Sequence, residues 1–192
     1  MVPADLAATG KEHMRILKLL AFALVGASLA GVAAKAQDLE NTLYMDLDHG
    51  RVVIELLPEL APLHVERIKE LTRAGFYDGV VFHRVIEGFM AQSGDPTGTG
   101  RGGSDLPDLP AEFTDTPYER GTLGMARTND PDTANSQFFI TFNDQYDSSL
   151  RGNYTVFGRV VSGMEFVDQI EKGEPPANPD EIIRLSVAAD VE

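Results

Sequence analysis

The sequence predicts a mainly β fold, a single antiparallel barrel capped by two α-helices. Residues 37–192 contain many short runs rich in Val, Ile, Phe and Tyr, separated by Gly and Pro. Only two segments have the apolar spacing of an amphipathic helix. Strands and helices do not alternate along the chain, which argues against a doubly wound parallel sheet.

The first predicted elements are a hairpin and a helix. Residues 42–47 and 51–56 are rich in apolar and β-branched residues, and Asp48-His49-Gly50 between them has the composition of a turn. Between Ala61 and Gly75 the apolar residues recur at helical spacing around charged ones, which predicts an amphipathic helix.

The remaining predicted elements are short. A second helix is expected at residues 164–171. Further strands are expected at residues 80–86, 121–126, 137–142, 155–161 and 182–187.

Residues 1–36 differ from the rest of the chain. Basic residues precede the apolar run 19–32, and Ala34-Lys35-Ala36 follows it. A basic start, a short apolar core and an Ala-x-Ala exit are features of a secretory signal peptide. The alternative, a membrane anchor, needs about 20 strongly apolar residues, more than this run offers. Because a leader that starts at Met14 has the usual length, residues 1–13 are interpreted as an upstream extension.

The leader predicts a periplasmic protein that is not inserted in a membrane once the leader is removed. Its removal takes away four basic and two acidic residues and changes the net charge from −14 to −16. Residues 37–192 are then one acidic domain, expected to be a monomer. Such acidity argues against a nucleic-acid partner, since nucleic-acid binders present a basic face.

Composition and motifs exclude several kinds of site. With no Cys, the chain has no thiolate nucleophile and no Cys-ligated metal. The histidines are scattered without zinc-site spacing, so no metal site is predicted. Residues 98–103 match G-x-G-x-x-G, but Pro107 and Pro110 prevent a helix from opening after them, so we interpret this segment as a flexible surface loop.

Three segments contain most of the remaining candidate site residues: residues 82–92, residues 124–127 and residues 136–140. Residues 154–158 follow the third segment along the chain. Strand alternation is expected to turn Phe82 and Arg84 to one face. An apolar hollow could then form with one cation and one or two amides at its rim, lined by Phe89, Met90, Met125, Phe139 and Leu150. An Arg with no carboxylate partner nearby suits polarising a neutral group; the alternative is a surface cation that pairs with an acid.

The residues of these segments and their order along the chain resemble the cyclophilin family of peptidyl-prolyl cis–trans isomerases. The resemblance extends from Thr42 to Val187. The resemblance rests on Phe-His-Arg-x-Ile-x-Gly-Phe-Met-x-Gln at residues 82–92 and on Ser-Gln-Phe-Phe-Ile at residues 136–140. It implies a closed eight-stranded barrel with two helices, no cofactor, and proline-containing polypeptides as partners. It further implies that Arg84 is catalytic. The substrate-binding residues implied are Phe89, Met90, Gln92, Met125, Ala126, Arg127, Gln137, Phe139, Leu150 and Tyr154.

The chain departs from the family pattern at three places. Arg127 stands where Asn is frequent, and Tyr154 where His is frequent. Residues 143–149 form a longer loop without the Trp that many members carry. Two other interpretations compete with an active isomerase: a catalytically weak peptide-binding chaperone module on the same barrel, and a carrier barrel that encloses a small ligand.

Overall fold

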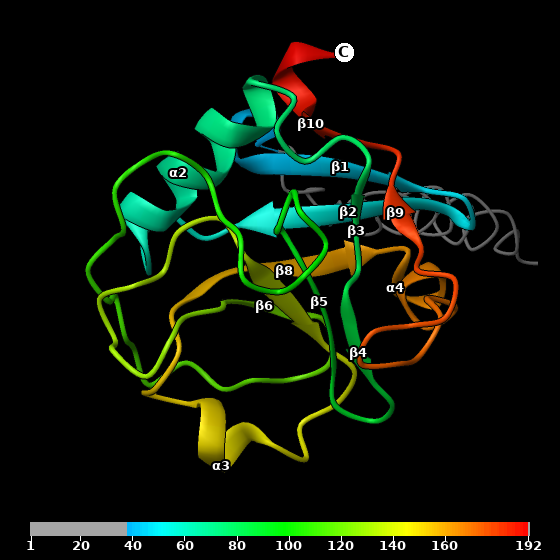
Figure 1. The fold of residues 1–192 in the computed structure, drawn as a ribbon. Coiled ribbons are helices and arrows are strands. Elements are labelled where there is room, and N and C mark those ends of the chain that lie inside the picture. Colours follow the sequence, from blue (N-terminus) through cyan, green and yellow to red (C-terminus); the bar gives the residue numbers. More distant parts are fainter. Residues whose placement is uncertain (1–37, 192) are drawn as a thin grey trace, which may run out of the picture. The chain divides into compact units, whose positions relative to one another are not determined.

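The computed structural model describes residues 38–191, so the predicted leader lies outside the described residues. Eight strands are β1 Thr42–Leu47, β2 Gly50–Leu56, β4 Arg84–Ile86, β5 Met90–Ser93, β6 Thr122–Met125, β7 Phe138–Thr141, β8 Val156–Ser162 and β10 Arg184–Val187. They form one antiparallel sheet in the order β10-β1-β2-β8-β6-β7-β5-β4, which curls around the main core (Figure 1).

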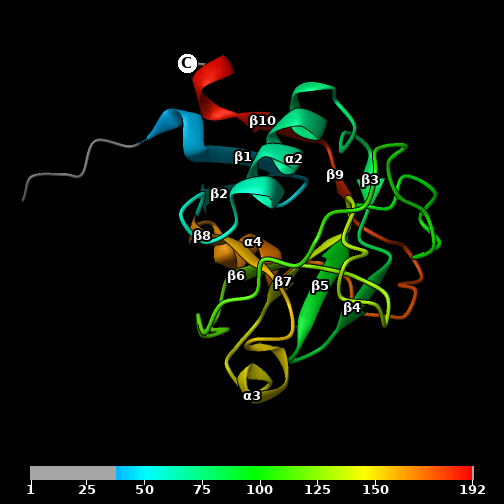
Figure 2. The same ribbon diagram turned by 90° about the vertical axis from the view of Figure 1, so that its left-hand side faces the viewer.

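The structure contains three α-helices among the described residues, not the two expected. They are α2 Pro62–Arg73, α3 Asp147–Leu150 and α4 Met164–Val167. Helix α2 confirms the predicted amphipathic helix, but α4 covers only the first half of residues 164–171. Helix α3 was not predicted, because a single turn is too short to show apolar periodicity. Helices α2 and α3 lie at opposite ends of the domain (Figures 1 and 2).

Two predicted strands are each split by an interruption. Residues 80–86 divide into β3 Val80–Val81 and β4, and residues 182–187 divide into β9 Glu181–Ile182 and β10. Strands β3 and β9 pair with each other as a separate two-stranded sheet. The interruption also changes the side-chain alternation: Phe82 is fully buried in the main core, while Arg84 is partly exposed. The expectation that these two side chains share a face was wrong.

The barrel is not closed, which corrects the expectation of a closed eight-stranded barrel. Within residues 38–191, the edge strands β4 and β10 do not pair with each other. Instead, Gly173 forms an isolated antiparallel bridge with Val85, and each donates its backbone N–H to the carbonyl of the other at 2.8 Å. The backbone at Gly173 therefore occupies the position on the edge of β4 that a closing strand would need.

The apolar side chains form two clusters. The main core includes Leu43, Ile54, Phe82, Phe138 and Phe157, all nearly inaccessible to solvent. A smaller cluster gathers around Met90, Tyr118, Phe139, Leu150 and Val156. Since neighbouring residues of a strand point to opposite faces, Phe138 joins the first cluster and Phe139 the second. The curled sheet is thus apolar on both faces at this point.

His64 forms a buried contact between α2 and the segment that precedes β6. Its ring is fully buried, and Nδ1 lies 2.6 Å from Oε2 of Glu112, which also accepts the backbone N–H of His64. Burial lowers the pKa of His64 from its usual value of 6.5, although the hydrogen bond to Glu112 acts in the opposite direction. The ring is therefore neutral at neutral pH and donates its Nδ1 proton to Glu112.

This contact should make stability depend on pH in a defined direction. The unfolded chain binds a proton at His64 near the usual pKa of 6.5, while the folded protein resists it. The free energy of unfolding should therefore fall as the pH drops below that value, by up to about 1.4 kcal/mol per pH unit from this group. Above it, His64 contributes its full stabilisation.

His64→Gln is the variant that tests this expectation, because Gln can donate to Glu112 but does not titrate. Chemical denaturation from pH 8 to about pH 5 should show the variant gaining stability relative to wild type as the pH falls. Parallel pH curves for the two proteins would contradict the expectation.

Candidate functional site

A row of residues across four strands places the candidate site. Arg84 of β4 lies opposite Gln92 of β5, which lies opposite Phe139 of β7. Phe139 in turn lies opposite Gly124 of β6. Directly opposed residues project to the same face of a sheet. Hence Arg84, Gln92 and Phe139 face the same side although they are far apart in the chain.

The smaller apolar cluster lies on this face and surrounds a cavity of about 220 Å³. The cavity is lined by Arg84, Phe89, Met90, Gln92, Ala126, Arg127, Phe139, Leu150 and Tyr154. Nine of the eleven site residues predicted from the sequence therefore meet in one place. Six of the nine lining side chains are apolar or aromatic, and Arg84, Gln92 and Arg127 supply the polar groups.

Gly124 allows the floor of the cavity to close. A Cβ atom at this position would collide with the rings of Tyr118 and Phe139. These two rings stack with their centroids 5.7 Å apart. Burial raises the pKa of the Tyr118 hydroxyl, so it stays neutral. Tyr118 was not predicted from the sequence, and it supports Phe139 from beneath.

Two predicted residues lie elsewhere. Met125 belongs to the main core and is 1% exposed, because it follows Gly124 on β6 and so points to the other face. Grouping it with the apolar hollow was therefore incorrect. Gln137 lies beside the cavity, not in it. It accepts a hydrogen bond from Nε2 of Gln92 at 2.9 Å, and it lines a neighbouring cavity.

Arg84 is held by two side chains. Its Nε donates to Oε2 of Glu174 at 2.8 Å, and its Nη1 donates to Oε1 of Gln92 at 3.3 Å. The expectation that Arg84 has no carboxylate nearby was wrong, since Glu174 comes from a segment 90 residues away in the chain. The guanidinium still lines the apolar cavity, where its remaining N–H groups can reach a bound peptide.

The glycine-rich loop at residues 98–103 borders the site and is tied down by hydrogen bonds. Asp95 is fully buried and accepts the backbone N–H groups of Thr97, Thr99 and Arg101. Burial by itself would raise the pKa of Asp95, but these hydrogen bonds hold it well below its usual range. The loop lies at the surface, as predicted, and its flexibility stays a prediction.

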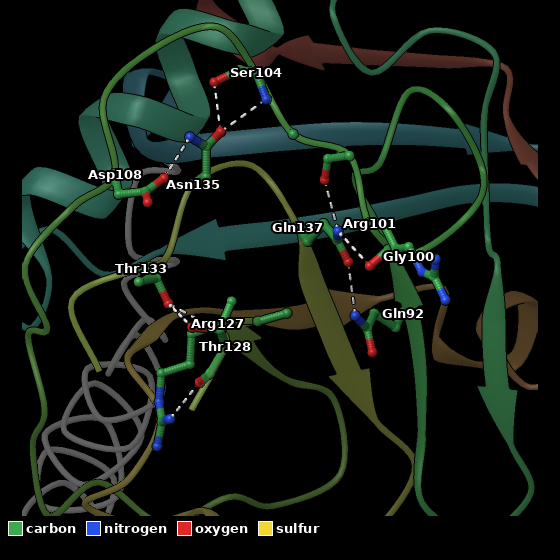
Figure 3. Close-up of a pocket in the computed structure, with 13 residues that line it drawn as sticks. Gln92, Gly100, Arg101, Ser104, Asp108, Arg127, Thr128, Thr133, Asn135 and Gln137 are labelled. Carbon is green, nitrogen blue, oxygen red and sulfur yellow. Dashed lines mark hydrogen bonds between the residues drawn. The ribbon is translucent and has the colours of Figure 1, made fainter. Parts of the chain in front are cut away.

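Gln137 connects this loop to the site. Its Nε2 donates to the carbonyl oxygens of Gly100 and Gly102, at 3.2 and 2.8 Å. Figure 3 shows Gln137 lying between Gln92 and the loop. This neighbouring cavity has a volume of about 580 Å³ and continues past Asn135 to Arg127. A chain of hydrogen bonds thus runs from Glu174 through Arg84, Gln92 and Gln137 to the loop.

The two substituted family positions contact each other. The Arg127 guanidinium lies 4.6 Å from the ring centre of Tyr154, and it donates to the carbonyls of Asn153 and Thr128. Tyr154 packs edge-on against Phe139 at 5.6 Å. Arg127 therefore joins two loops at the cavity rim, with most of its donors used by backbone carbonyls. This favours a supporting role over a direct charge contact with substrate.

The site thus combines a curled antiparallel sheet with a cavity on the smaller apolar cluster, whose polar groups come from Arg84, Gln92 and Arg127. Among residues 38–191, no group of His, Asp and Glu side chains is arranged to hold a metal ion. Over the same residues, no helix is long and apolar enough to cross a membrane.

Comparisons with known proteins identify the family. The sequence model of the cyclophilin type peptidyl-prolyl cis-trans isomerase/CLD family matches residues 42–187. A probable peptidyl-prolyl cis-trans isomerase of Brucella suis is 50% identical, with 90% of this chain and 95% of the relative covered. The rat peptidyl-prolyl cis-trans isomerase-like 3 is 44% identical, covering 68% of this chain and 81% of the relative. This chain belongs to the cyclophilin-type peptidyl-prolyl cis–trans isomerases.

Solved structures agree with this assignment. A cyclophilin from Hirschia baltica has a TM-score of 0.73 and 29% identity, covering 81% of this chain and 76% of that one. A Cryptosporidium parvum cyclophilin, determined in the presence of the dipeptide Ala-Pro, has a TM-score of 0.70 and 30% identity. It covers 76% of this chain and 98% of that one.

Proposed function

We propose that this isomerase accelerates X–Pro isomerisation in extracytoplasmic polypeptides, with the proline ring in the cavity of about 220 Å³ and Arg84 acting on the twisted amide. One observation carries the proposal: Arg84 lines, beside Gln92, a cavity whose wall includes Phe89, Met90, Phe139 and Leu150. Such a wall suits a proline ring, and we assign the prolyl nitrogen to the place beside the Arg84 guanidinium.

The barrier to the reaction explains what the site must do. Rotation about the peptide bond breaks amide resonance and costs about 18–20 kcal/mol. At the twisted geometry the prolyl nitrogen becomes pyramidal and gains a lone pair. An N–H of Arg84 forms a stronger hydrogen bond to this lone pair than to the nitrogen of a planar amide. The transition state is therefore stabilised more than either ground state.

The neighbouring groups hold the rest of the peptide. Gln92 is fixed between Arg84 and Gln137, so its position is defined before substrate binds. The N–H of Ala126 donates to the carbonyl of Gln137 at 2.9 Å, so we assign the peptide contact to the Ala126 carbonyl. With the ring and the preceding residues held, rotation moves the carbonyl on the proline's N-terminal side.

The competing proposal is a catalytically weak peptide-binding chaperone module on the same fold. The placement of Arg84 at the cavity favours the active enzyme, since peptide binding alone does not need a donor aimed at the prolyl nitrogen. An isomerisation assay on residues 37–192 with a proline-containing peptide decides between them: turnover supports the enzyme, and tight binding without turnover supports the module. The carrier is disfavoured because the main core fills the inner face of the sheet.

The location of the protein rests on the sequence features of residues 1–36. The basic start, the apolar run and Ala34-Lys35-Ala36 support cleavage after Ala36, and we expect the exported protein to begin at Gln37. N-terminal sequencing of the protein recovered from a periplasmic extract measures this directly. Recovery of the intact chain from the membrane fraction would favour an anchor.

A further inference from the structure

We infer that Glu174 is a positioning residue for Arg84, so that the segment that interrupts the barrel also orients the catalytic side chain. The inference rests on the proposed function, because it assumes that Arg84 acts on the prolyl nitrogen. The structural observation is the contact itself: Oε2 of Glu174 accepts the Nε proton of Arg84 at 2.8 Å.

The backbone places Glu174 independently of its side chain. Val85 and Gly173 face each other in an antiparallel bridge, with both reciprocal N–H to carbonyl bonds at 2.8 Å. In an antiparallel pair the residue before one partner lies opposite the residue after the other. Residue 174 is therefore set opposite residue 84. The Arg84–Glu174 contact follows from the register and does not depend on a chance meeting of long side chains.

Gly173 is suited to this place by its backbone. Its φ is 155°, and a Cβ atom would lie 2.5 Å from Cα of Pro176. A side chain at this position would collide with the backbone of the following prolines. Glycine thus lets the chain turn back through Pro175 and Pro176 directly after the bridge, and the bridge itself fixes the backbone position of Glu174.

The guanidinium is held from two sides at a defined orientation. Glu174 takes the Nε proton, and Gln92 takes an Nη1 proton. A guanidinium is planar, so two fixed contacts at different nitrogens determine the plane and the direction of the remaining N–H groups. Arg84 lines both the proposed proline cavity and a neighbouring cavity of about 610 Å³, whereas Glu174 lines only the second. Glu174 therefore holds Arg84 from the second cavity and leaves the wall of the first to the guanidinium.

The contact contributes little to the stability of the fold. The side chains of Arg84 and Glu174 are 41% and 53% exposed, and ion pairs so exposed to water add little to folding. Its effect is expected in catalysis, where a donor that is turned away from the nitrogen loses transition-state stabilisation. This difference makes the two roles separable by experiment.

The test compares Glu174→Ala with Glu174→Gln by measuring kcat and KM through exchange spectroscopy on a proline-containing peptide. We expect Glu174→Ala to lower kcat about three- to tenfold with KM nearly unchanged. Glu174→Gln keeps an oxygen acceptor at the same reach and should recover most of this loss. The matched control is Glu55→Ala, which breaks the exposed ion pair with Arg159 and should leave kcat unchanged.

A spectroscopic readout reports the contact itself. The Nε–H resonance of Arg84, assigned by its loss in Arg84→Ala, should exchange slowly with water in the wild-type protein and in Glu174→Gln, and quickly in Glu174→Ala. Wild-type kcat in Glu174→Ala, or a Gln variant as slow as the Ala variant, would overturn the positioning role alone. Full activity in Arg84→Ala would instead overturn the proposed function.

Discussion

Arg84→Ala should lower kcat/KM for proline-peptide isomerisation by about ten- to a thousandfold, the range expected when one transition-state donor is removed. Each tenfold loss corresponds to about 1.4 kcal/mol of lost transition-state stabilisation. The proposal assigns Arg84 a contact that strengthens only when the amide is twisted, so kcat should fall more than KM rises. A coupled or exchange-based isomerisation assay gives both values.

Arg84→Ala should leave the stability of the fold nearly unchanged. Arg84 is partly exposed, and its ion pair with Glu174 is of the solvent-exposed kind that typically adds about 0–1 kcal/mol. Circular dichroism and the midpoint of thermal unfolding should therefore match wild type. Arg159→Ala is the control, because Arg159 also pairs with a glutamate at the surface but lines none of the cavities at the site. Equal activity in both variants would contradict the mechanism.

Arg84→Lys adds a second comparison. Lysine keeps the charge but carries its three donors on one tetrahedral nitrogen, so it cannot reproduce the planar arrangement in which separate nitrogens contact Glu174 and Gln92 and leave an N–H for the prolyl nitrogen. We expect it to remain closer to the Ala variant than to wild type. A Lys variant with full turnover would show that a positive charge suffices, and that the directed guanidinium is unnecessary.

The site residues that lie on strands could be predicted from the sequence. Residues 84–92 form one hairpin, so alternation places Arg84, Met90 and Gln92 on one face once the first of these is assigned. The same rule explains the error at Met125. Next to a glycine on a short strand, an apolar residue gives no sign of which face it occupies, and a shift by one residue reverses the face.

The parts that could not be predicted depend on contacts between distant segments. Glu174 reaches Arg84 through an isolated bridge at Gly173, and an isolated bridge leaves no periodic pattern in the sequence. The open barrel has the same origin, since the backbone at Gly173 occupies the edge of β4. Tyr118 was missed because it lies in an irregular segment, where its burial beneath Phe139 depends on the absence of a side chain at Gly124.

Weak inhibition by cyclosporin is the second large effect that we expect. The resemblance implies that cyclic-peptide inhibitors of the family contact a Trp whose indole packs and donates a hydrogen bond, and this chain has no Trp. Losing one such hydrogen bond and part of an aromatic contact costs on the order of 1–3 kcal/mol. The inhibition constant should therefore be roughly ten- to a hundredfold weaker than in a Trp-bearing member.

Tyr146 is the aromatic residue of the longer loop, and it contacts a residue that lines the cavity. Tyr146, just before α3, is 38% exposed, and its ring centre lies 4.3 Å from that of Phe89. Tyr146 thus packs behind Phe89 in the cavity wall without lining the cavity itself. Since Tyr146 does not line the cavity, turnover should survive its replacement by another aromatic side chain that can pack on Phe89.

Tyr146→Trp tests whether the missing indole is the cause. The larger ring can keep the contact with Phe89 and offers an N–H donor at the rim, so the variant should gain inhibitor affinity by about tenfold, the effect of one hydrogen bond, at nearly constant kcat/KM. Titration of cyclosporin against turnover measures both variants under the same conditions. Tight inhibition of the wild-type protein would mean that Tyr146 or another rim residue already replaces the indole. If Tyr146→Trp binds cyclosporin no more tightly than the wild-type protein, the backbone path of residues 143–149 weakens inhibition, and not the missing indole.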